Sequence, residues 1–580
     1  MLEVIGIEAD EALIAAWAAR VERAGAWLAW HDRRWVARRH ARGLSLALTA
    51  PCDQLFLATE VNEWALCAAL AGRDSSVGPQ LLQALAAAAL EQANGTPAAV
   101  PEPPVLEESA ALARFVQLAE REAHPALRAL LAAAEVRGLS QVIDDDELTL
   151  GAGSGGRSFL LGSLPDCADV PWNTLHNVPT ALVTGSNGKT TTVRLLAACA
   201  RAHGWHTGYN CTDGVYRDSE VIESGDYSGP VGARRVLREP LVEAAILETA
   251  RGGILRRGIA VSRTDVAVVT NVSADHFGEF GIDDLAALAD VKLSVASLVG
   301  AHGLLVLNAD DPQLRRKADQ LAQRFGSSPP LAWFSLDADL LPLRQHRAAA
   351  GSTCGVSVGR MLLNHRGNEH DLGPINAMPL SVGGVATYNV ANLAAAALAA
   401  VALSIPATTI AQVFAQFGAQ ATDNPGRLMR FEFNGAQVLV DYAHNPDGLR
   451  GLLTVARHLL KSRNSSRSTQ GRLGLLLGHA GNRGDADIEA LARVAAEFRP
   501  DLVVVKEVET HLRGRTPGEI PRIIRAELLR AGMPAATLPV SSSEVAAVCH
   551  ALEWAQPGDV LALLVHSAAA RATVLAMLNP

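Results

Sequence analysis

Hydrophobic residues between positions 180 and 310 fall into short runs that are separated by stretches with helical spacing. Each run ends close to a polar or glycine-containing turn. Short buried strands that alternate with helices are typical of a mostly parallel sheet with helices on both faces. We therefore expect a central α/β domain whose strands include Leu182–Thr184, Ala244–Glu248, Val266–Asn271 and Leu304–Asn308.

A second α/β pattern begins near Asn424 and indicates a Rossmann-like C-terminal domain. A helix is predicted over 485–497, and the Ser- and Arg-rich segment Lys461–Gly471 is predicted to be a solvated loop. The predicted strands are Val438–Asp441, Leu473–Leu477, Leu502–Val505 and Val560–Val565.

The first part of the chain has a different pattern, with helical spacing at Leu13, Ile14, Trp17 and Val21 and an apolar run at Leu44–Leu48. This mixture predicts an α+β N-terminal domain. The Gly- and Ser-rich patch at 151–163 and the stretch that follows to Pro179 indicate a linker. The predicted domains are thus residues 1–162, 180–423 and 424–580, with the linker at 163–179.

Composition narrows the functional class. The 580 residues are 49% hydrophobic and carry a formal net charge of −9, which gives no reason to expect nucleic-acid binding. The basic run Arg33–Arg42 is interpreted as a solvated helix face. Seven scattered cysteines without a C-x-x-C pair fit a reducing compartment. The acidic N-terminus and the short apolar stretch Leu393–Ile405 favour a cytoplasmic protein without a membrane anchor.

Residues 182–191, Leu-Val-Thr-Gly-Ser-Asn-Gly-Lys-Thr-Thr, form the most specific motif. A glycine loop between a strand and a helix presents backbone N–H groups to phosphate oxygens. The lysine adds positive charge, and the first threonine offers a hydroxyl to Mg²⁺. We expect a nucleoside triphosphate to bind Gly185, Ser186, Asn187, Gly188, Lys189, Thr190 and Thr191.

Further polar residues follow the other predicted strands. Glu248 ends one strand, Asp275 and His276 follow the next, Lys292 lies on a later helix, and Asn308 ends the fourth strand. Ligands bind at the carboxyl ends of the strands in such sheets. The pattern therefore predicts that these groups gather around the triphosphate.

The string Thr-Gly-x-Asn-Gly-Lys-Thr-Thr resembles the ATP loop of the Mur ligase superfamily. The pair Asn389 and Asn392, the Pro-Gly-Arg string ending at Arg427, and the string from Asp441 to Pro446 also match that family's motifs. The resemblance implies an ADP-forming, ATP-dependent ligase that joins an acid to an amino acid, with ATP and Mg²⁺ as cofactors.

The same resemblance implies individual roles. Thr190, Glu248 and His276 would hold Mg²⁺, and Lys292 would be carbamylated by CO₂ and help to bind the metal. Asn308 would contact adenine and Asp441 the ribose. Arg427 would reach the γ-phosphate from the C-terminal domain, so that closure of the two domains assembles the site.

Within this superfamily the chain resembles the cyanophycin synthetase group in both its N-terminal and its Mur-ligase parts. The matching strings are Leu46–Trp64, Glu248–Arg256, Thr270–His276, Leu512–Glu519 and Pro557–Asp559. That group carries an ATP-grasp domain where this chain has only Gly162–Leu182. Residues 478–487 also depart from the group's pattern. Candidate substrate residues are Asn389, Asn392, His444, Arg483, Asp485, Arg513, Arg515 and Glu519.

The resemblance implies that a basic amino acid is joined to an aspartyl carboxylate of a peptide or amino-acid acceptor. Two alternatives stay open. The chain could be another Mur-type ligase that acts on polyglutamate or a cell-wall precursor, or a non-catalytic ATP-binding subunit of a partner ligase. A partner ligase and a homo-oligomer are also left open, whereas nucleic-acid and membrane partners are not expected.

Overall fold

A computed structural model of the chain describes residues 1–7, 10–40, 43–74, 77–92, 105–274, 277, 279–464, 470–481 and 483–578. The chain forms two compact units. The first contains Met1–Gly151, Arg157–His176 and a short segment that ends at Leu288, and the second contains most of the remaining chain, including Pro580.

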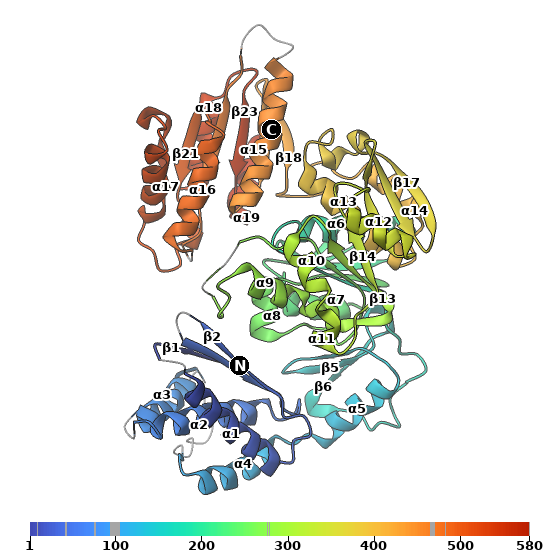
Figure 1. The fold of residues 1–580 in the computed structure, drawn as a ribbon, viewed down its shortest axis with the longest axis vertical. Helices are drawn as coiled ribbons and strands as arrows, with labels where there is room; N and C mark the ends of the chain where they lie inside the picture. The colour runs from blue at the N-terminus through green and yellow to red at the C-terminus, as the bar shows by residue number, and fades with distance from the viewer. Residues whose placement is uncertain are drawn as a thin grey trace. The chain divides into compact units, whose positions relative to one another are not determined.

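The first unit is an α+β structure, as predicted (Figure 1). An antiparallel sheet in the order β1-β3-β2 packs on α1 and α2 around the buried Trp17, Leu44 and Leu46. The basic run was predicted to be helical, which is wrong, because Trp35–His40 form a strand. The elements are β1 (Leu2–Ile5), α1 (Glu11–Trp27), β2 (Trp35–His40), β3 (Gly43–Leu48), α2 (Leu55–Ala71), α3 (Val77–Gln92) and α4 (Glu108–Glu122).

The Gly- and Ser-rich patch at 151–163 is more ordered than the predicted linker. It contains β6, which pairs antiparallel with β5 in a second three-stranded sheet. Gly153 lies against the carbonyl of Val242, where a Cβ would approach the oxygen to 2.2 Å. Gly153 is therefore a glycine because the backbone packs closely there. The elements are α5 (Pro125–Val136), β4 (Gln141–Ile143), β5 (Glu147–Leu150) and β6 (Arg157–Leu160).

The second unit begins with an 11-stranded sheet in the order β10-β9-β8-β11-β7-β12-β13-β14-β15-β16-β17. Its centre, from β8 to β15, is parallel, and an antiparallel hairpin extends each edge. The bounds are β7 (Thr180–Thr184), β8 (Thr207–Cys211), β9 (Gly214–Arg217), β10 (Glu220–Ser224), β11 (Ala244–Glu248), β12 (Thr264–Val269), β13 (Val299–Asn308), β14 (Leu331–Phe334), β15 (Ser352–Ser357), β16 (Arg360–His365) and β17 (Asn368–Pro374).

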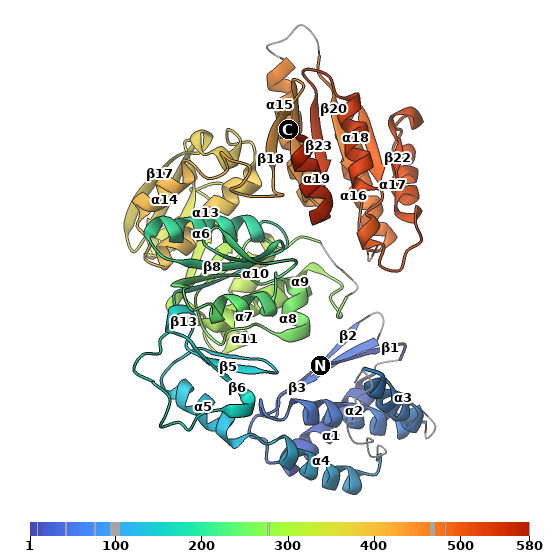
Figure 2. The same ribbon diagram turned by 180° about the vertical axis from the view of Figure 1, so that it is seen from behind.

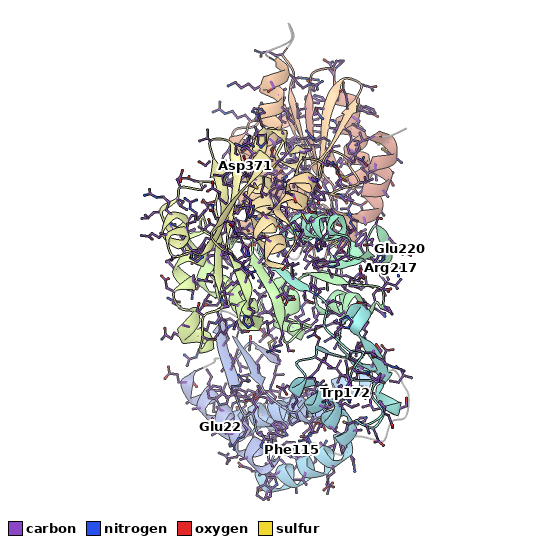
Figure 3. All side chains as sticks on the ribbon, turned by 90° about the vertical axis from the view of Figure 1, so that its right-hand side faces the viewer. Glu22, Phe115, Trp172, Arg217, Glu220 and Asp371 are labelled. Atoms are coloured by element: carbon purple, nitrogen blue, oxygen red, sulfur yellow. The ribbon has the colours of Figure 1, made fainter. Side chains whose placement is uncertain are left out.

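Helices cover both faces of this sheet. Side chains of α6 and α13 share one core with Ala181, Val183 and Ile246, and α7 packs on the opposite face (Figure 1). At the β9–β10 edge, Arg217 forms ion pairs with Glu220 and Glu239 (Figure 3). The helices are α6 (Lys189–His203), α7 (Pro230–Arg238), α8 (Arg251–Arg257), α9 (Leu285–Lys292), α10 (Pro312–Ala318), α11 (Leu321–Phe325), α12 (Leu341–Ala348), α13 (Thr387–Ala402) and α14 (Ala407–Phe414).

The rest of the second unit is built on a six-stranded sheet in the order β18-β19-β23-β20-β21-β22, parallel except for β18. Leu475 and Leu477 face a core with α15, α16 and α17, whereas Leu476 faces α18 and α19 (Figures 1 and 2). The strands are β18 (Met429–Phe433), β19 (Ala436–Asp441), β20 (Leu473–Leu477), β21 (Leu502–Lys506), β22 (Val540–Ser541) and β23 (Val560–Leu564).

The helices of this domain run almost as predicted. The helix predicted at 485–497 is α16. The predicted loop Lys461–Gly471 is partly wrong, because α15 continues to Asn464, and residues 465–469 lie outside the described part. Across the described residues we find no helix with the length and apolarity to span a membrane. The helices are α15 (Pro446–Asn464), α16 (Asp485–Glu497), α17 (Glu519–Arg530), α18 (Glu544–Trp554) and α19 (Ala568–Leu578).

Candidate active site

The glycine loop lies between β7 and α6, as the motif predicts. Gly185 and Gly188 have φ values of +147° and +85°, and Gly188 is the residue before the helix. The carbonyl of Asn187 accepts hydrogen bonds from Thr270 Oγ1 at 2.6 Å and from Asn271 Nδ2 at 3.0 Å. The end of β12 thus fixes the loop, and its glycines allow a backbone that other residues rarely adopt.

A buried asparagine pair supports the same loop from α13. Asn392 donates to Asn389 Oδ1 at 3.2 Å, and Asn389 donates to the carbonyl of Leu380 at 3.0 Å. A Cβ on Gly188 would lie 2.2 Å from Asn392 Oδ1. Asn389 and Asn392 were predicted to contact substrate. In the structure they bond to each other and pack under the loop, and a contact with substrate stays a prediction.

Lys189 folds back over the loop at the start of α6. Its Nζ donates to the carbonyls of Gly185 and Ser186, both at 3.1 Å. These carbonyls hold the ammonium group directly over the glycine loop, where phosphate oxygens would offer it charged acceptors. The position suits a lysine that binds a polyphosphate.

Glu248 and Thr190 meet at the end of β11. Thr190 Oγ1 donates to Glu248 Oε2 at 2.8 Å, and Thr212 Oγ1 lies 3.3 Å from Glu248 Oε1. Glu248 is only 1% exposed. Burial raises the pKa of Glu248, and the nearby charges of Lys189 and Arg427 oppose the rise. The hydroxyl and the carboxylate fit Mg²⁺, which prefers oxygen ligands.

The other predicted metal ligands are His276 and Lys292. Asp275 and His276 lie outside the described residues. Lys292 ends α9 and is 3% exposed, so it has the burial that a carbamylated lysine needs. Asp290, one helical half-turn earlier, forms surface ion pairs with Lys317 and Arg324. The metal roles of His276 and Lys292 stay predictions.

Asn308 is held at the end of β13 by its neighbours. Its Nδ2 donates to the carbonyl of Thr270 at 3.0 Å, and its Oδ1 accepts from the N–H of Asp310 at 2.9 Å. Thr270 in turn braces the glycine loop. The predicted contact of Asn308 with adenine stays a prediction. Asn308 is hydrogen bonded to Thr270, which is the residue that supports the glycine loop.

Arg427 and Asp441 occupy neighbouring loops of the C-terminal domain. The Arg427 guanidinium stacks 4.5 Å from the centre of the Tyr442 ring. Asp441 accepts from the N–H of Leu428 at 2.6 Å and from the N–H of Ala443 at 2.7 Å. Its carboxylate therefore ties the Arg427 loop to the β19 loop. The charge of Arg427 lowers the pKa of Asp213 and opposes the raised pKa of Glu248.

Sequence reasoning missed the residues that join the two domains. Asn445 Nδ2 donates to Asn187 Oδ1 at 2.8 Å, and Asn424 Nδ2 donates to Thr191 Oγ1 at 3.1 Å. Asn445 follows His444 within a string that matched the family, in which only Asp441 and His444 were selected. Asp213 accepts from Arg194 at 2.7 Å and pairs with Arg571 of α19. No local sequence pattern identifies Asp213, Arg194 and Arg571 as one connected group.

Most of the predicted amino-acid-binding residues gather at the loops after β20 and β21. Arg515 pairs with Asp485 at 2.7 Å and with Glu519 at 2.6 Å, and it donates to the carbonyl of Arg483 at 2.7 Å. The pKa of Glu519 falls to about 2 because of Arg515 and Thr516. We call Arg483, Asp485, Arg515 and Glu519 the Arg515 cluster.

The other two substrate candidates lie elsewhere. Arg513 is exposed beside the cluster with a φ of +45°. His444 lies on the β19 loop, where its ring is 5.7 Å from that of Tyr442. The structure thus places the predicted substrate residues on α13 and on the loops after β19, β20 and β21.

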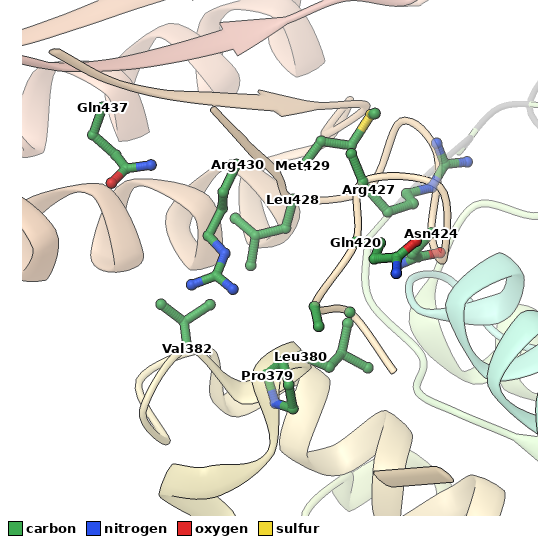
Figure 4. Close-up of a pocket in the computed structure, with 13 residues that line it drawn as sticks. Pro379, Leu380, Val382, Gln420, Asn424, Arg427, Leu428, Met429, Arg430 and Gln437 are labelled. Carbon is green, nitrogen blue, oxygen red and sulfur yellow. The ribbon is translucent and has the colours of Figure 1, made fainter. Parts of the chain in front are cut away.

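A cavity of about 240 Å³ opens beside Arg427 (Figure 4). One wall comes from Pro379, Leu380 and Val382 of the central domain, and the other from the start of β18. In the close-up the Arg430 guanidinium extends toward Val382, and that of Arg427 points to the other side. Arg427 therefore lines the cavity without pointing into it, and its contact with the γ-phosphate stays a prediction.

Comparisons with known proteins agree with this geometry. Residues 183–400 match the Mur ligase middle domain, and residues 426–564 match the Mur ligase glutamate ligase domain. The chain is 35% identical over 383 residues to cyanophycin synthetase from Synechocystis sp., covering 66% of this chain and 42% of that protein. It thus spans less than half of that relative's length.

Two more distant similarities are also found. The chain is 28% identical to a UDP-N-acetylmuramoyl-L-alanyl-D-glutamate–2,6-diaminopimelate ligase from Parasynechococcus marenigrum, covering 65% of this chain and 70% of that protein. Folylpolyglutamate synthase from Mycobacterium tuberculosis, solved with ADP and AMPPCP, superposes with a TM-score of 0.48 at 17% identity, covering 69% and 91% of the two chains. The two matched domains together cover more than half of the sequence, and the chain belongs to the Mur ligase family.

Proposed function

We propose that this protein is an ATP-dependent amide ligase that couples an amino-acid amine to a substrate carboxylate. One observation carries the proposal: Lys189 over the glycine loop, the buried pair of Thr190 and Glu248, and the charge of Arg427 all converge at the end of β11. A triphosphate needs this combination of cations, backbone donors and oxygen ligands.

In the proposed reaction, a carboxylate oxygen attacks the γ-phosphorus of ATP, and the bond to the β-phosphate oxygen breaks. This releases ADP and leaves an acyl phosphate. The amine nitrogen then attacks the acyl carbon, inorganic phosphate leaves, and the nitrogen loses a proton. Lys189 and Arg427 would balance the negative charge of the transferring group, since the planar guanidinium pairs with two oxygens at once.

Mg²⁺, when bound, would neutralise charge on the phosphates. Thr190 and Glu248 are the described residues that would hold it, with His276 and a carbamylated Lys292 as further proposed ligands. The Thr190 hydroxyl is already aligned by Glu248 at 2.8 Å. A preformed pair reduces the ordering that binding requires.

The proposed substrates are a basic amino acid and an aspartyl carboxylate on a peptide or amino-acid acceptor. The similarity to cyanophycin synthetase supports this choice. A basic side chain that binds at the Arg515 cluster would take the place of Arg515 as the partner of Asp485 or Glu519. A cytoplasmic location, and a partner ligase that makes the acceptor, are part of the same proposal.

Mass spectrometry of ATP-dependent products tests the proposal. The protein is incubated with ATP, Mg²⁺, a panel of amino acids and short aspartyl peptides. We expect a product whose mass equals acceptor plus amino acid minus water, formed with one ADP and one phosphate. Products from folates or UDP-linked peptides would instead indicate another Mur-type ligase. If no acceptor yields an amide, the proposal is wrong.

A further inference from the structure

A fully buried ion pair lies at the carboxyl edge of the C-terminal sheet, outside the residues assigned above. Lys506 ends β21 and Glu544 begins α18, and both side chains are 0% exposed where they pair. A buried pair is costly unless hydrogen bonds satisfy its remaining atoms. Glu544 meets this condition, because it accepts from the N–H of His566 at 2.9 Å and from the N–H of Ser567 at 2.7 Å.

The pair also fixes the ring of His566. Lys506 Nζ lies 3.2 Å from His566 Nδ1, and His566 Nε2 lies 3.3 Å from the carbonyl of Ala443. An ammonium group only donates, so Nδ1 is the acceptor and the proton is on Nε2, facing Ala443. Burial and the charge of Lys506 lower the pKa of His566 well below its usual value, which agrees with a neutral ring.

The ring lies against the loop that carries the contacts with nucleotide-binding residues. Tyr442 packs edge-on to His566 with ring centres 5.3 Å apart, and its own ring supports Arg427. Asn445, two residues after the bonded carbonyl of Ala443, donates to Asn187 of the glycine loop. His566 therefore connects the buried pair to both of these contacts.

The same carboxylate anchors a second loop. Ser567, held by Glu544, accepts from the N–H of Arg571 at 2.9 Å in the first turn of α19. Arg571 forms an ion pair with Asp213, whose other partner is Arg194 on the helix of the glycine loop. The positions of two separate chain segments, 442–445 and 566–571, thus depend on the buried carboxylate of Glu544.

We propose that Lys506, Glu544 and His566 form a positioning unit that sets the loops 442–445 and 566–571 against the glycine loop. The unit would control the rate of phosphoryl transfer rather than the affinity for ATP, because it touches neither the glycine loop nor its lysine. This inference rests on the proposed function. It also predicts that the loop 442–445 is held in place, which can be measured without any turnover.

The test compares His566→Phe with His566→Gln in the full chain. Phenylalanine keeps a ring against Tyr442 and loses the Nε2–H donor, whereas glutamine keeps a donor. His346→Phe is the matched control, since His346 Nε2 also faces a main-chain carbonyl, that of Leu331, at 2.9 Å on α12. The measurements are kcat, KM for ATP, thermal unfolding, and hydrogen exchange of the amides at 442–448.

We expect His566→Phe to lower kcat about tenfold or more while KM for ATP changes less than about twofold. Amide exchange at 442–448 should rise, and His566→Gln should recover most of both properties. If His566→Phe does not fold, the double variant Lys506→Met with Glu544→Gln gives the same comparison without an unpaired buried charge.

Unchanged exchange at 442–448 in His566→Phe would overturn the positioning unit even if the protein has no measurable turnover. A loss of kcat equal to that of His346→Phe would also overturn it. The absence of any amide product from the unaltered protein would contradict the proposed function instead. The exchange measurement thus distinguishes a failure of the positioning unit from a failure of the proposed function.

Discussion

The two ends of the proposed active site are built in opposite ways, although both lie at carboxyl ends of parallel strands. At the phosphate end, Glu248 is 1% and Thr190 is 4% exposed, and each is hydrogen bonded inside the protein. In the Arg515 cluster, the Asp485 side chain is 61% exposed and the Arg515 side chain 19%. One end is buried and fixed, and the other is a surface network of ion pairs.

The difference shows where the fold constrains the chemistry. A buried polar group must keep its partners, because losing one leaves the other unsatisfied. Exposed ion pairs contribute little to stability, so their residues can change without loss of the fold. We infer that the phosphate end is the fixed part of the site, and that the Arg515 cluster can vary with the amino acid used.

The largest effect is expected for Lys189→Ala. Removing the ammonium group over the glycine loop should lower ATP turnover at least about 100-fold, with the fold retained. Lys317→Ala is the matched control, because Lys317 pairs with Asp290 on the surface. The measurement is ADP release in the presence of both substrates. Unchanged stimulation of a partner ligase by Lys189→Ala would instead support a non-catalytic role.

The second-largest effect on activity is expected for Gly188→Ala. The new methyl group would meet Asn392 Oδ1 at 2.2 Å, at a φ of +85°. We expect kcat/KM for ATP to fall about 30-fold, because the loop must shift away from the phosphates. Gly204→Ala is the control, since Gly204 ends the same helix at φ +106° with open space around it. Equal losses in the two variants would mean that backbone strain, not crowding, is responsible.

Two substitutions at Asn445 should separate an effect on catalysis from an effect on stability. Asn445→Asp keeps the oxygen that caps Gly448 at 2.9 Å and loses the donor to Asn187. We expect both Asn445→Asp and Asn445→Ala to lower kcat about tenfold, whereas only Asn445→Ala should lose about 1 kcal/mol of unfolding free energy. Steady-state kinetics and urea unfolding measure the two properties. Normal turnover in Asn445→Asp would show that the contact between the domains is dispensable.

The burial of His566 predicts that the stability of the folded protein depends on pH. Because burial keeps its pKa well below 6.5, the unfolded chain binds a proton that the folded protein does not as the pH falls through that value. The wild-type protein should therefore lose stability between about pH 7 and pH 5 relative to His566→Gln. Thermal unfolding of both proteins at several pH values measures this. A constant difference in melting temperature would contradict a neutral, buried His566.

The smallest effect on stability is expected at the Arg515 cluster. Asp485→Asn removes one exposed partner of Arg515, and Glu519 remains. The melting temperature should change by less than about 2 °C, while KM for the amino acid rises several-fold with KM for ATP unchanged. Kinetics with each substrate varied in turn give the comparison. A large loss of stability would show that this end is as constrained as the phosphate end.

Much of the fold could be predicted because its signals are local. The strands Ala244–Glu248 and Leu473–Leu477 and the helix 485–497 occur at the predicted residues. The hairpins at the sheet edges were not predicted, since the antiparallel pairing of β9 with β8 and β10 cannot be read from the hydrophobic period alone. The patch at 151–163 misled because it contains β6 and because Gly153 serves close packing rather than a flexible linker.

The sequence by itself determined the central strands, the glycine loop and the position of its lysine, because each of these is encoded within a few residues. Only the tertiary structure decided what surrounds them. Asn445 meets a partner 258 residues away, and Arg571 one 358 residues away. The raised pKa of Glu248 likewise comes from burial by distant segments. Such properties depend on which groups share a low-dielectric interior, and that is fixed only when the chain has folded.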